Sequence, residues 1–167
     1  QRERGCTGYG VELADGNVLQ CIRRGVDVIQ LNLDEGLAMF DDRSFDVVLQ
    51  LDTMQHLRNT ERMLRETARV GHIGIVSFPN FAHWPNRLRV ASGRMPVTKA
   101  LPYQWYDTPN IHAFTIRDFV DLVDLCGGRI VRSTALDQDG QPIRVNVPWW
   151  FWNLFGAQAV FLLRRDR

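Results

Sequence analysis

Apolar residues along the chain fall into short continuous runs and into longer segments where they recur every three or four positions. The short runs predict β-strands, and the helically spaced segments predict amphipathic helices. The predicted strands are residues 6–13, 26–33, 45–51, 73–78, 129–136 and 157–163, and the predicted helices are residues 15–24, 60–70, 86–92 and 116–126. Strands and helices alternate through the first half, which favours an α/β fold with a Rossmann-like, mostly parallel sheet.

Local signals mark where several of these elements begin. Asn59 is the expected cap of the second helix, and Asp15 or Asn17 is the expected cap of the first. The stretch Thr115-Ile-Arg-Asp118 has the form of a capping box, which predicts a helix start. The centre of the third strand, Val47-Val-Leu49, is continuously apolar, which predicts a strand covered on both faces.

Residues 81–114 interrupt this regular pattern with four prolines and many His, Trp, Tyr and Asn residues. We expect one domain over residues 1–167, with residues 81–114 as an irregular insertion over the C-terminal edge of the sheet. A loop region of this length is usually functional when it is ordered. The residues predicted to face a substrate or a partner here are Asn80, His83, Trp84, Tyr106, Asn110 and His112. The alternative is a structural hydrogen-bond network.

Composition and charge narrow the function classes. The net charge of +1, with basic residues scattered, does not favour nucleic-acid binding. No apolar run approaches the roughly 20 residues that span a membrane. Cys6, Cys21 and Cys126 follow no metal-ligand spacing, so no metal site is predicted. Their low number is typical of reduced thiols in a cytoplasmic protein.

The run Gly8-Tyr-Gly-Val-Glu-Leu13 places one acidic residue, Glu12, at the end of the first predicted strand. Ligands of open α/β sheets bind outside the carboxyl ends of the strands, and a carboxylate there can accept hydrogen bonds from both ribose hydroxyls. The alternative is a Glu12 that ends a strand and points to water. His56 lies past the third strand and is a candidate general base, against the alternative of a packed loop histidine.

A dense aromatic cluster lies near the C-terminus within Pro148–Phe155. Its members are Trp149, Trp150, Trp152 and Phe155, and we expect a hairpin-like segment there. An exposed cluster of this kind suits a homodimer or hetero-partner interface, where Trp is enriched. The alternative is a lid folded back onto the sheet.

The chain resembles a class I S-adenosylmethionine-dependent methyltransferase domain in Tyr9-Gly-Val-Glu12, Ser44-Phe-Asp-Val-Val48 and Gln55-His-Leu57. A closer resemblance, over essentially the whole chain, is to the MetW family of methionine biosynthesis. The strings that carry it are Leu33-Asp-Glu-Gly-Leu37, Val76-Ser-Phe-Pro-Asn-Phe81, His83-Trp84, Gly93-Arg-Met-Pro-Val97, Leu101-Pro-Tyr103 and Trp105-Tyr-Asp-Thr-Pro-Asn-Ile-His112.

The resemblance assigns roles to particular residues. Glu12 would bind the ribose of S-adenosylmethionine and Leu13 would pack on its adenine. Asn32 stands where such proteins usually have Asp beside the adenine amino group, and its carbonyl keeps an acceptor there. Leu33 would flank the ring. Leu51 would lie near the methionine part together with Asp52, which joins His56 as a candidate catalytic residue.

One departure from the family pattern concerns the glycine-rich loop of the type Asp-x-Gly-x-Gly, which the sequence lacks. That loop follows the first strand of the fold, and the strand lies in the middle of the sheet. Gln1 would correspond to the end of the first helix, so we expect about one strand and most of one helix to be missing in front of it. The sheet would then have a gap for another segment or another copy to fill.

The MetW resemblance implies a methyltransferase-fold protein of methionine biosynthesis that binds S-adenosylmethionine, supports homoserine O-acyltransferase, or does both. One alternative is an active methyltransferase on an unknown small molecule. Another is a non-catalytic interaction subunit with a vestigial pocket. Methyl transfer needs little beyond alignment of nucleophile and methyl group, so the absence of an obvious acid–base pair leaves catalysis open.

Overall fold

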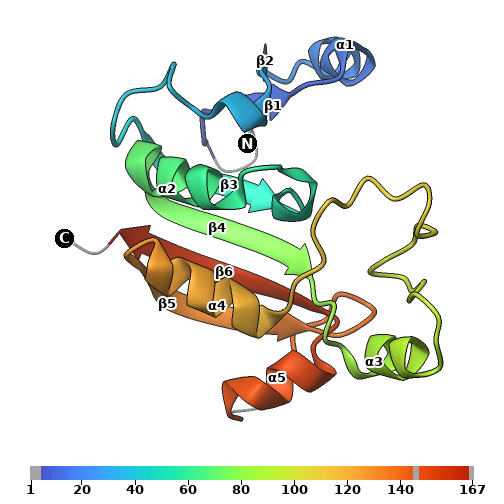
Figure 1. Cartoon of the computed structure of the whole chain (residues 1–167). Coiled ribbons are helices and arrows are strands. Elements are labelled where there is room, and N and C mark those ends of the chain that lie inside the picture. Colours follow the sequence, from blue (N-terminus) through green and yellow to red (C-terminus); the bar gives the residue numbers. More distant parts are fainter. Residues whose placement is uncertain (1–4, 145–146, 166–167) are drawn as a thin grey trace.

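The computed structural model describes residues 5–144 and 147–165, and its strands form two separate sheets (Figure 1). In the smaller sheet, β1 (Gly10–Glu12) pairs in parallel with β2 (Val28–Gln30). The larger sheet has the order β3 (Phe45–Leu51), β4 (Gly71–Pro79), β6 (Gln158–Arg165) and β5 (Gly128–Leu136). In it β3 and β4 are parallel, and β6 is antiparallel to both of its neighbours. The α/β prediction is confirmed.

The helices are α1 (Asp15–Arg23), α2 (Thr60–Val70), α3 (Trp84–Ala91), α4 (Ile116–Leu125) and α5 (Trp149–Phe155), with single turns η2 (Leu33–Glu35) and η3 (Met54–His56). Helices α2 and α4 lie against the same face of the larger sheet (Figure 1). The carboxyl ends of β3 and β4 point toward the irregular segment that joins α3 to α4.

Aromatic side chains fill the space between α4 and this face of the sheet. The rings of Phe78 and Phe161, from β4 and β6, stack at 5.8 Å, and Phe119 of α4 lies 4.7 Å and 4.9 Å from them. All three side chains are buried. Each such pair adds about 0.5–1.5 kcal/mol to the gain from burying the rings, so this cluster fixes α4 on the sheet.

Two predicted helix starts are confirmed and one is wrong. The Asn59 side chain accepts a hydrogen bond from the Arg62 N–H at 3.0 Å, and Thr115 with Asp118 forms the reciprocal capping box. Helix α1 begins at Asp15, with Ala14 in the cap position and no capping bond from the side chain of Asp15 or Asn17. The Glu12 carboxylate accepts the N–H groups of Leu13 and Ala14, the two residues just before the helix.

The prediction that the third strand is covered on both faces is wrong. Gln50 is buried and Val48 half-buried on the side of α2, but Val47, Leu49 and Leu51 are 44%, 60% and 59% exposed. Among the described residues, β3 pairs only with β4, and the helix contacts of the larger sheet come from α2 and α4. Within the described residues, β3 is therefore covered on one face only.

The expected hairpin-like aromatic segment is also corrected, because residues 149–155 form helix α5. Trp152 packs against the core cluster, while Trp150 and Phe155 are exposed. The described side chains of the cluster therefore differ in exposure, and the side chain of Trp149 lies outside the described residues. The lid and the interface that the sequence left as alternatives both stay predictions.

Arg69 of α2 ties the loop before β3 to the larger sheet. Its guanidinium donates to the carbonyls of Leu37 and Phe40 at 3.0 Å and 2.9 Å. It also pairs with Glu66 at 2.7 Å and with Asp42 at 2.8 Å. The Glu66 carboxylate in turn accepts the Leu37 N–H at 3.1 Å. These contacts position the segment that leads from the smaller sheet to the larger one.

We expect the Glu66 carboxylate to make a pH-dependent contribution to the free energy of unfolding. Its hydrogen bond from Arg69 lowers the pKa of Glu66 below its ordinary value of 4.5. A lowered folded-state pKa stabilises the protein above pH 4.5, and this stabilisation is lost as the pH falls through the folded value. We expect Glu66→Gln to lower the free energy of unfolding by about 1–2 kcal/mol at pH 7, and by progressively less below pH 4.5.

Urea unfolding of the two proteins at pH 7 and pH 3.5 measures this difference. The matched control is Glu61→Gln, because Glu61 pairs with Arg65 on an exposed helix surface. That variant should change stability by less than about 0.5 kcal/mol. An equal loss for Glu66→Gln at both pH values would contradict the assignment.

Candidate functional site

The structure brings Glu12 and Asn32 together at one end of the smaller sheet. Glu12 is the last residue of β1, and Asn32 follows the end of β2 by two residues. The strands are parallel, with Glu12 opposite Gln30 and the Leu31 N–H bonded to the Glu12 carbonyl at 3.1 Å. Leu13 next to Glu12 is exposed, and Leu33 is half-buried against the core. This end of the sheet therefore presents a carboxylate, an amide and two leucines.

Glu12 is held as an anion by its local backbone. One carboxylate oxygen accepts the Ala14 N–H at 2.9 Å and the Leu13 N–H at 2.8 Å. These bonds, the Ala14 one foremost, together with the side chain of Asn17 lower the pKa of Glu12. The ionised group lies at the N-terminus of α1, where the helix dipole favours negative charge. Its orientation is thus fixed before any ligand arrives.

Asn32 has its own structural contacts. Its carbonyl oxygen caps η2 by accepting the Asp34 N–H at 3.1 Å, and its amide nitrogen lies 3.4 Å from the Glu35 carboxylate. A side-chain carbonyl has two lone pairs, so the capping bond leaves acceptor capacity. The fit to an adenine amino group is therefore retained, although without the charge that an Asp would supply.

Leu51 and Asp52 lie at the carboxyl end of β3, in the larger sheet, and so on a different sheet from Glu12 and Asn32. Asp52 adopts a left-handed backbone conformation, with φ of 51°. Its N–H donates to the carbonyl and hydroxyl of Ser77, at 3.0 Å and 3.1 Å. A left-handed backbone conformation is uncommon in residues other than glycine. It persists where the surrounding structure stabilises it, often near functional sites.

His56 is engaged with the irregular segment. Its Nδ1 lies 3.1 Å from the Pro109 carbonyl, a contact that requires the proton on Nδ1. The neighbouring Gln55 accepts the N–H groups of Ile111 and His112 through its backbone carbonyl, at 2.8 Å and 3.1 Å. The turn after β3 therefore fastens residues 109–112, and the Nε2 atom of His56 is the nitrogen left for acid–base chemistry.

The buried Asn80 side chain joins three elements. Its amide nitrogen donates to the Asn153 and Gly156 carbonyls at 3.0 Å and 2.8 Å, and its oxygen accepts from Ala82 and Ile116 at 3.1 Å and 3.4 Å. It is only 1% exposed. Asn80 thus belongs to the structural network that the sequence left as the alternative.

The other residues expected to face a substrate divide into three groups. His83 is buried at the start of α3, and burial lowers its pKa. Trp84 and Tyr106 are exposed, in edge contact with His83 and Trp105 respectively. Asn110 and His112 line one hollow, together with Gln55. The sequence analysis named Gln55 only as part of the family string Gln55-His-Leu57. That string does not predict that Gln55 lines a hollow.

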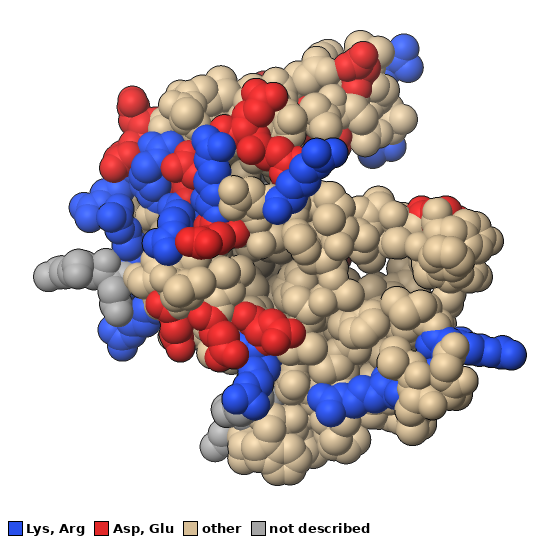
Figure 2. Space-filling model, in the orientation of Figure 1, with Lys and Arg blue, Asp and Glu red and all other residues tan. Residues whose placement is uncertain are grey.

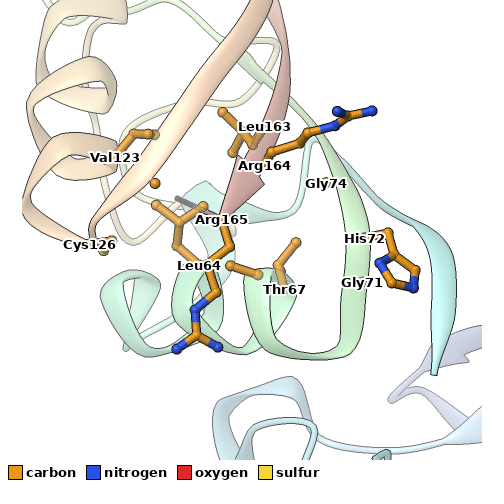
Figure 3. Close-up of a pocket in the computed structure, with 12 residues that line it drawn as sticks. Leu64, Thr67, Gly71, His72, Gly74, Val123, Cys126, Leu163, Arg164 and Arg165 are labelled. Atoms are coloured by element: carbon orange, nitrogen blue, oxygen red, sulfur yellow. The ribbon is translucent and has the colours of Figure 1, made fainter. Parts of the chain in front are cut away.

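A second hollow lies between α2, α4, β4 and β6 (Figure 3). Its lining includes Leu64, Thr67, Gly71, Val123 and Cys126, at the amino end of β4. This is the end of β4 opposite to Asn80 and to the carboxyl ends of the parallel strands, so it is separate from the predicted cofactor residues. His72 lies beside it and is exposed.

Charge is distributed unevenly over the molecule. Acidic and basic side chains gather on the left side of the view, whereas the surface at middle right is mostly uncharged and the lower right carries a few Lys or Arg side chains (Figure 2). Among the residues that the structure describes, no group of three or more His, Cys, Asp or Glu side chains is arranged to hold a metal ion. Within the same residues, no helix has the length and apolar character needed to cross a membrane.

Sequence comparison links the chain to one family. It matches the sequence model of the family described as methionine biosynthesis protein MetW over residues 1–163. A protein of Rhodopirellula baltica named bifunctional methionine biosynthesis protein MetXA/MetW is 42% identical over 163 residues. That match covers 94% of this chain and 25% of the relative, so the chain spans about a quarter of the relative's length.

Solved structures share the fold. An S-adenosylmethionine-dependent methyltransferase of Archaeoglobus fulgidus superposes with a TM-score of 0.67 at 13% identity, covering 99% of this chain and 78% of that one. One from Mesorhizobium loti gives 0.67 at 14% identity, covering 98% and 83%. One from Thermotoga maritima gives 0.64 at 20% identity, covering 95% and 72%. These likenesses confirm the predicted class I methyltransferase fold.

The Asn80 network generates a prediction about stability. Removing its amide leaves two backbone N–H groups and two carbonyls without their partner inside the protein, and unmet buried groups are costly. We expect Asn80→Ala to lower the free energy of unfolding by about 2–4 kcal/mol. Chemical denaturation followed by circular dichroism measures the change.

The control for this measurement is Gln20→Ala, which removes an exposed amide on α1. It should change the free energy of unfolding by less than about 0.5 kcal/mol. Equal stabilities for Asn80→Ala and Gln20→Ala would show that the network around Asn80 contributes nothing.

Proposed function

The chain belongs to the family of the methionine biosynthesis protein MetW, and we propose that it binds S-adenosylmethionine at the carboxyl ends of its parallel strands and supports homoserine O-acyltransferase. The observation that carries the cofactor proposal is the ionised Glu12 carboxylate at the end of β1, with Asn32 beside it at the end of β2. A fixed carboxylate at this edge is suited to the two ribose hydroxyls of a nucleoside.

The described residues fit the nucleoside part of this cofactor in chemistry and order. Glu12 would hold the ribose, and the Asn32 carbonyl would accept from the adenine amino group. The exposed side chain of Leu13 and the half-buried one of Leu33 would contact the two sides of the ring. Leu51 and Asp52, at the end of β3, would lie toward the methionine part. When bound, the cofactor supplies an activated methyl group.

The fused relative supports the partner proposal. Its printed name joins a MetXA part and a MetW part in one polypeptide of Rhodopirellula baltica. Two functions fused in one chain are held at high effective concentration, which favours pairs that act together. The homoserine O-acyltransferase implied by the family resemblance is therefore the proposed partner. The exposed side of α5, with Trp150 and Phe155, is the proposed contact surface, for this partner or for a second copy.

Methyl transfer to a small molecule is the second candidate function. The left-handed Asp52 and the hollow beside Gln55 adjoin the carboxyl end of β3, where the methyl group would be presented. His56 has a ring nitrogen that is not used by the Pro109 contact and could serve as a base. Product formation from S-adenosylmethionine would separate this candidate from a protein that binds the cofactor without using it.

Calorimetric titration of the full-length protein with S-adenosylmethionine tests the cofactor proposal. We expect binding, and we expect Glu12→Ala to weaken it by about 1–3 kcal/mol because a charged hydrogen-bonding group is lost. Glu12→Gln keeps an oxygen for the start of α1 while removing the charge, so it separates a ligand effect from a folding effect.

The control for the titration is Asp27→Ala, because Asp27 is exposed and lies before the amino end of β2. Its affinity should equal that of the unmodified protein. An unchanged affinity in both Glu12 variants would remove Glu12 from the site. Absence of binding at millimolar S-adenosylmethionine would refute the cofactor proposal and favour a non-catalytic interaction subunit with a vestigial pocket.

The partner proposal predicts co-elution. Mixed at micromolar concentration, the protein and the homoserine O-acyltransferase of the same organism should elute from a size-exclusion column as one species. Trp150→Ala should weaken that association by about 1–3 kcal/mol if Trp150 is an interface anchor. Leu125→Ala removes an exposed apolar side chain at the end of α4, outside the surfaces proposed for a partner, and serves as the matched control. Separate elution of the two unmodified proteins would refute the partnership.

A further inference from the structure

Helix α3 exposes apolar side chains on its outward side. Trp84 and Leu88 are four residues apart on one side of the helix, and they are 46% and 62% exposed. Asn86 lies two residues from each of them, on the opposite side, and is 2% exposed. A surface helix ordinarily turns its apolar side inward. The amphipathic pattern of α3 is therefore inverted, with an amide inward and a tryptophan and a leucine outward.

Basic side chains flank this apolar face, and the segment around it has no acidic residue. Residues 81–106 contain no Asp or Glu, and their Lys and Arg residues are Arg87, Arg89, Arg94 and Lys99. Lys99 is paired with Asp139, whereas Arg89 and Arg94 are exposed and form no ion pair with any other described residue. In the lower right of Figure 2, where Figure 1 places α3, basic side chains stand among uncharged ones. The outward face is therefore apolar at its centre and positively charged at its edges.

Hydrogen bonds hold α3 against the end of β4 and close its C-terminal end. The Asn86 side-chain amide donates to the Asn80 backbone carbonyl at 3.2 Å. After the helix, the Arg94 N–H donates to the Arg89 carbonyl at 3.0 Å, which brings the backbones of the two arginines together. The outward face is thus formed before any partner arrives, and a preformed surface lowers the ordering cost of association.

Helices α3 and α5 are fastened to the same residue. Asn80 follows β4, and its side-chain amide donates to the carbonyls of Asn153 and Gly156 at the end of α5, at 3.0 Å and 2.8 Å. Its backbone carbonyl accepts the bond from Asn86 of α3. Both helices therefore lie near the carboxyl end of β4 (Figure 1). The outward face of α3 extends the region available to a partner that contacts the exposed side of α5.

We propose that the outward face of α3 binds an acidic surface with an apolar centre on the homoserine O-acyltransferase. The proposal rests on the partnership proposed above, and it adds the α3 face and the charge of the matching surface. Trp84 and Leu88 would contact the apolar centre, and Arg89 and Arg94 would pair with carboxylates around it. Trp and Arg are enriched among the residues that dominate binding at protein interfaces. The fused relative, which joins a MetXA part to a MetW part, favours a protein as the occupant over a membrane.

The salt dependence of the affinity tests the charge of the partner surface. The full-length protein and the homoserine O-acyltransferase of the same organism are mixed without S-adenosylmethionine, and the Kd is measured by biolayer interferometry. We expect the Kd to rise about threefold to tenfold between about 50 mM and about 300 mM NaCl, because salt screens contacts between exposed opposite charges.

Two variants locate the contact on α3. Trp84→Ala removes an exposed ring and should raise the Kd about tenfold, as expected for an interface anchor. Arg89→Glu places a negative charge opposite the carboxylates of the partner. It should raise the Kd about tenfold at the lower salt concentration and by less at the higher one. Both side chains are exposed, so circular dichroism should show an unchanged fold.

The matched controls are Leu125→Ala and Arg24→Glu. The first removes an exposed apolar side chain at the end of α4. The second makes the same change in net charge as Arg89→Glu, at an exposed position that follows α1. Both should keep the Kd of the unmodified protein within about twofold.

Three results would overturn the proposal. If the unmodified proteins associate and both Trp84→Ala and Arg89→Glu keep that affinity, α3 is not in the interface and the partnership still stands. If the unmodified proteins do not associate at either salt concentration, the partnership and the role of α3 are refuted together. Co-sedimentation with vesicles of equimolar POPC and POPS that is lost in Trp84→Ala would make α3 a membrane contact instead.

Discussion

The turn after β3 and the irregular segment both depend on how β4 is held in the larger sheet. The strand pairs in parallel with β3 and antiparallel with β6, and its Val76 and Phe78 are fully buried under the helices. The chain leaves β4 through Asn80, whose side chain is bonded to the start of α4 and the end of α5. The turn after β3 and the irregular segment are therefore both positioned by a rigid central strand, as is usual for sites on α/β sheets.

The carboxylate of Glu12 combines a structural and a binding role. It completes the start of α1 by accepting two backbone N–H groups, and those same bonds keep it ionised. A carboxylate has about four lone-pair positions, so it can cap a helix and still accept from a ligand. The bonds to Leu13 and Ala14 thus fix the orientation in which the carboxylate would meet the proposed ribose.

Helix starts that depend on residues close together in the sequence could be predicted. The Asn59 cap and the Thr115 capping box are decided by neighbouring residues, and both are present in the structure. The family strings identified the MetW family and its fold. Coverage of the third strand was misjudged, since an apolar run does not state which elements pack on it. Gln55 was missed as a wall residue because its role arises from contacts with residues 111 and 112.

The open side of β3 has a consequence for what can pair with this strand. Its seven residues carry one acidic group, Asp46, and the outer edge of the strand is unpaired among the described residues. A long apolar edge strand with little charge is a template onto which a strand from another molecule can add. The unpaired edge of β3 is thus the place where a further strand, from another segment or from another copy, would add, and its neighbour would cover the exposed side chains of Val47, Leu49 and Leu51.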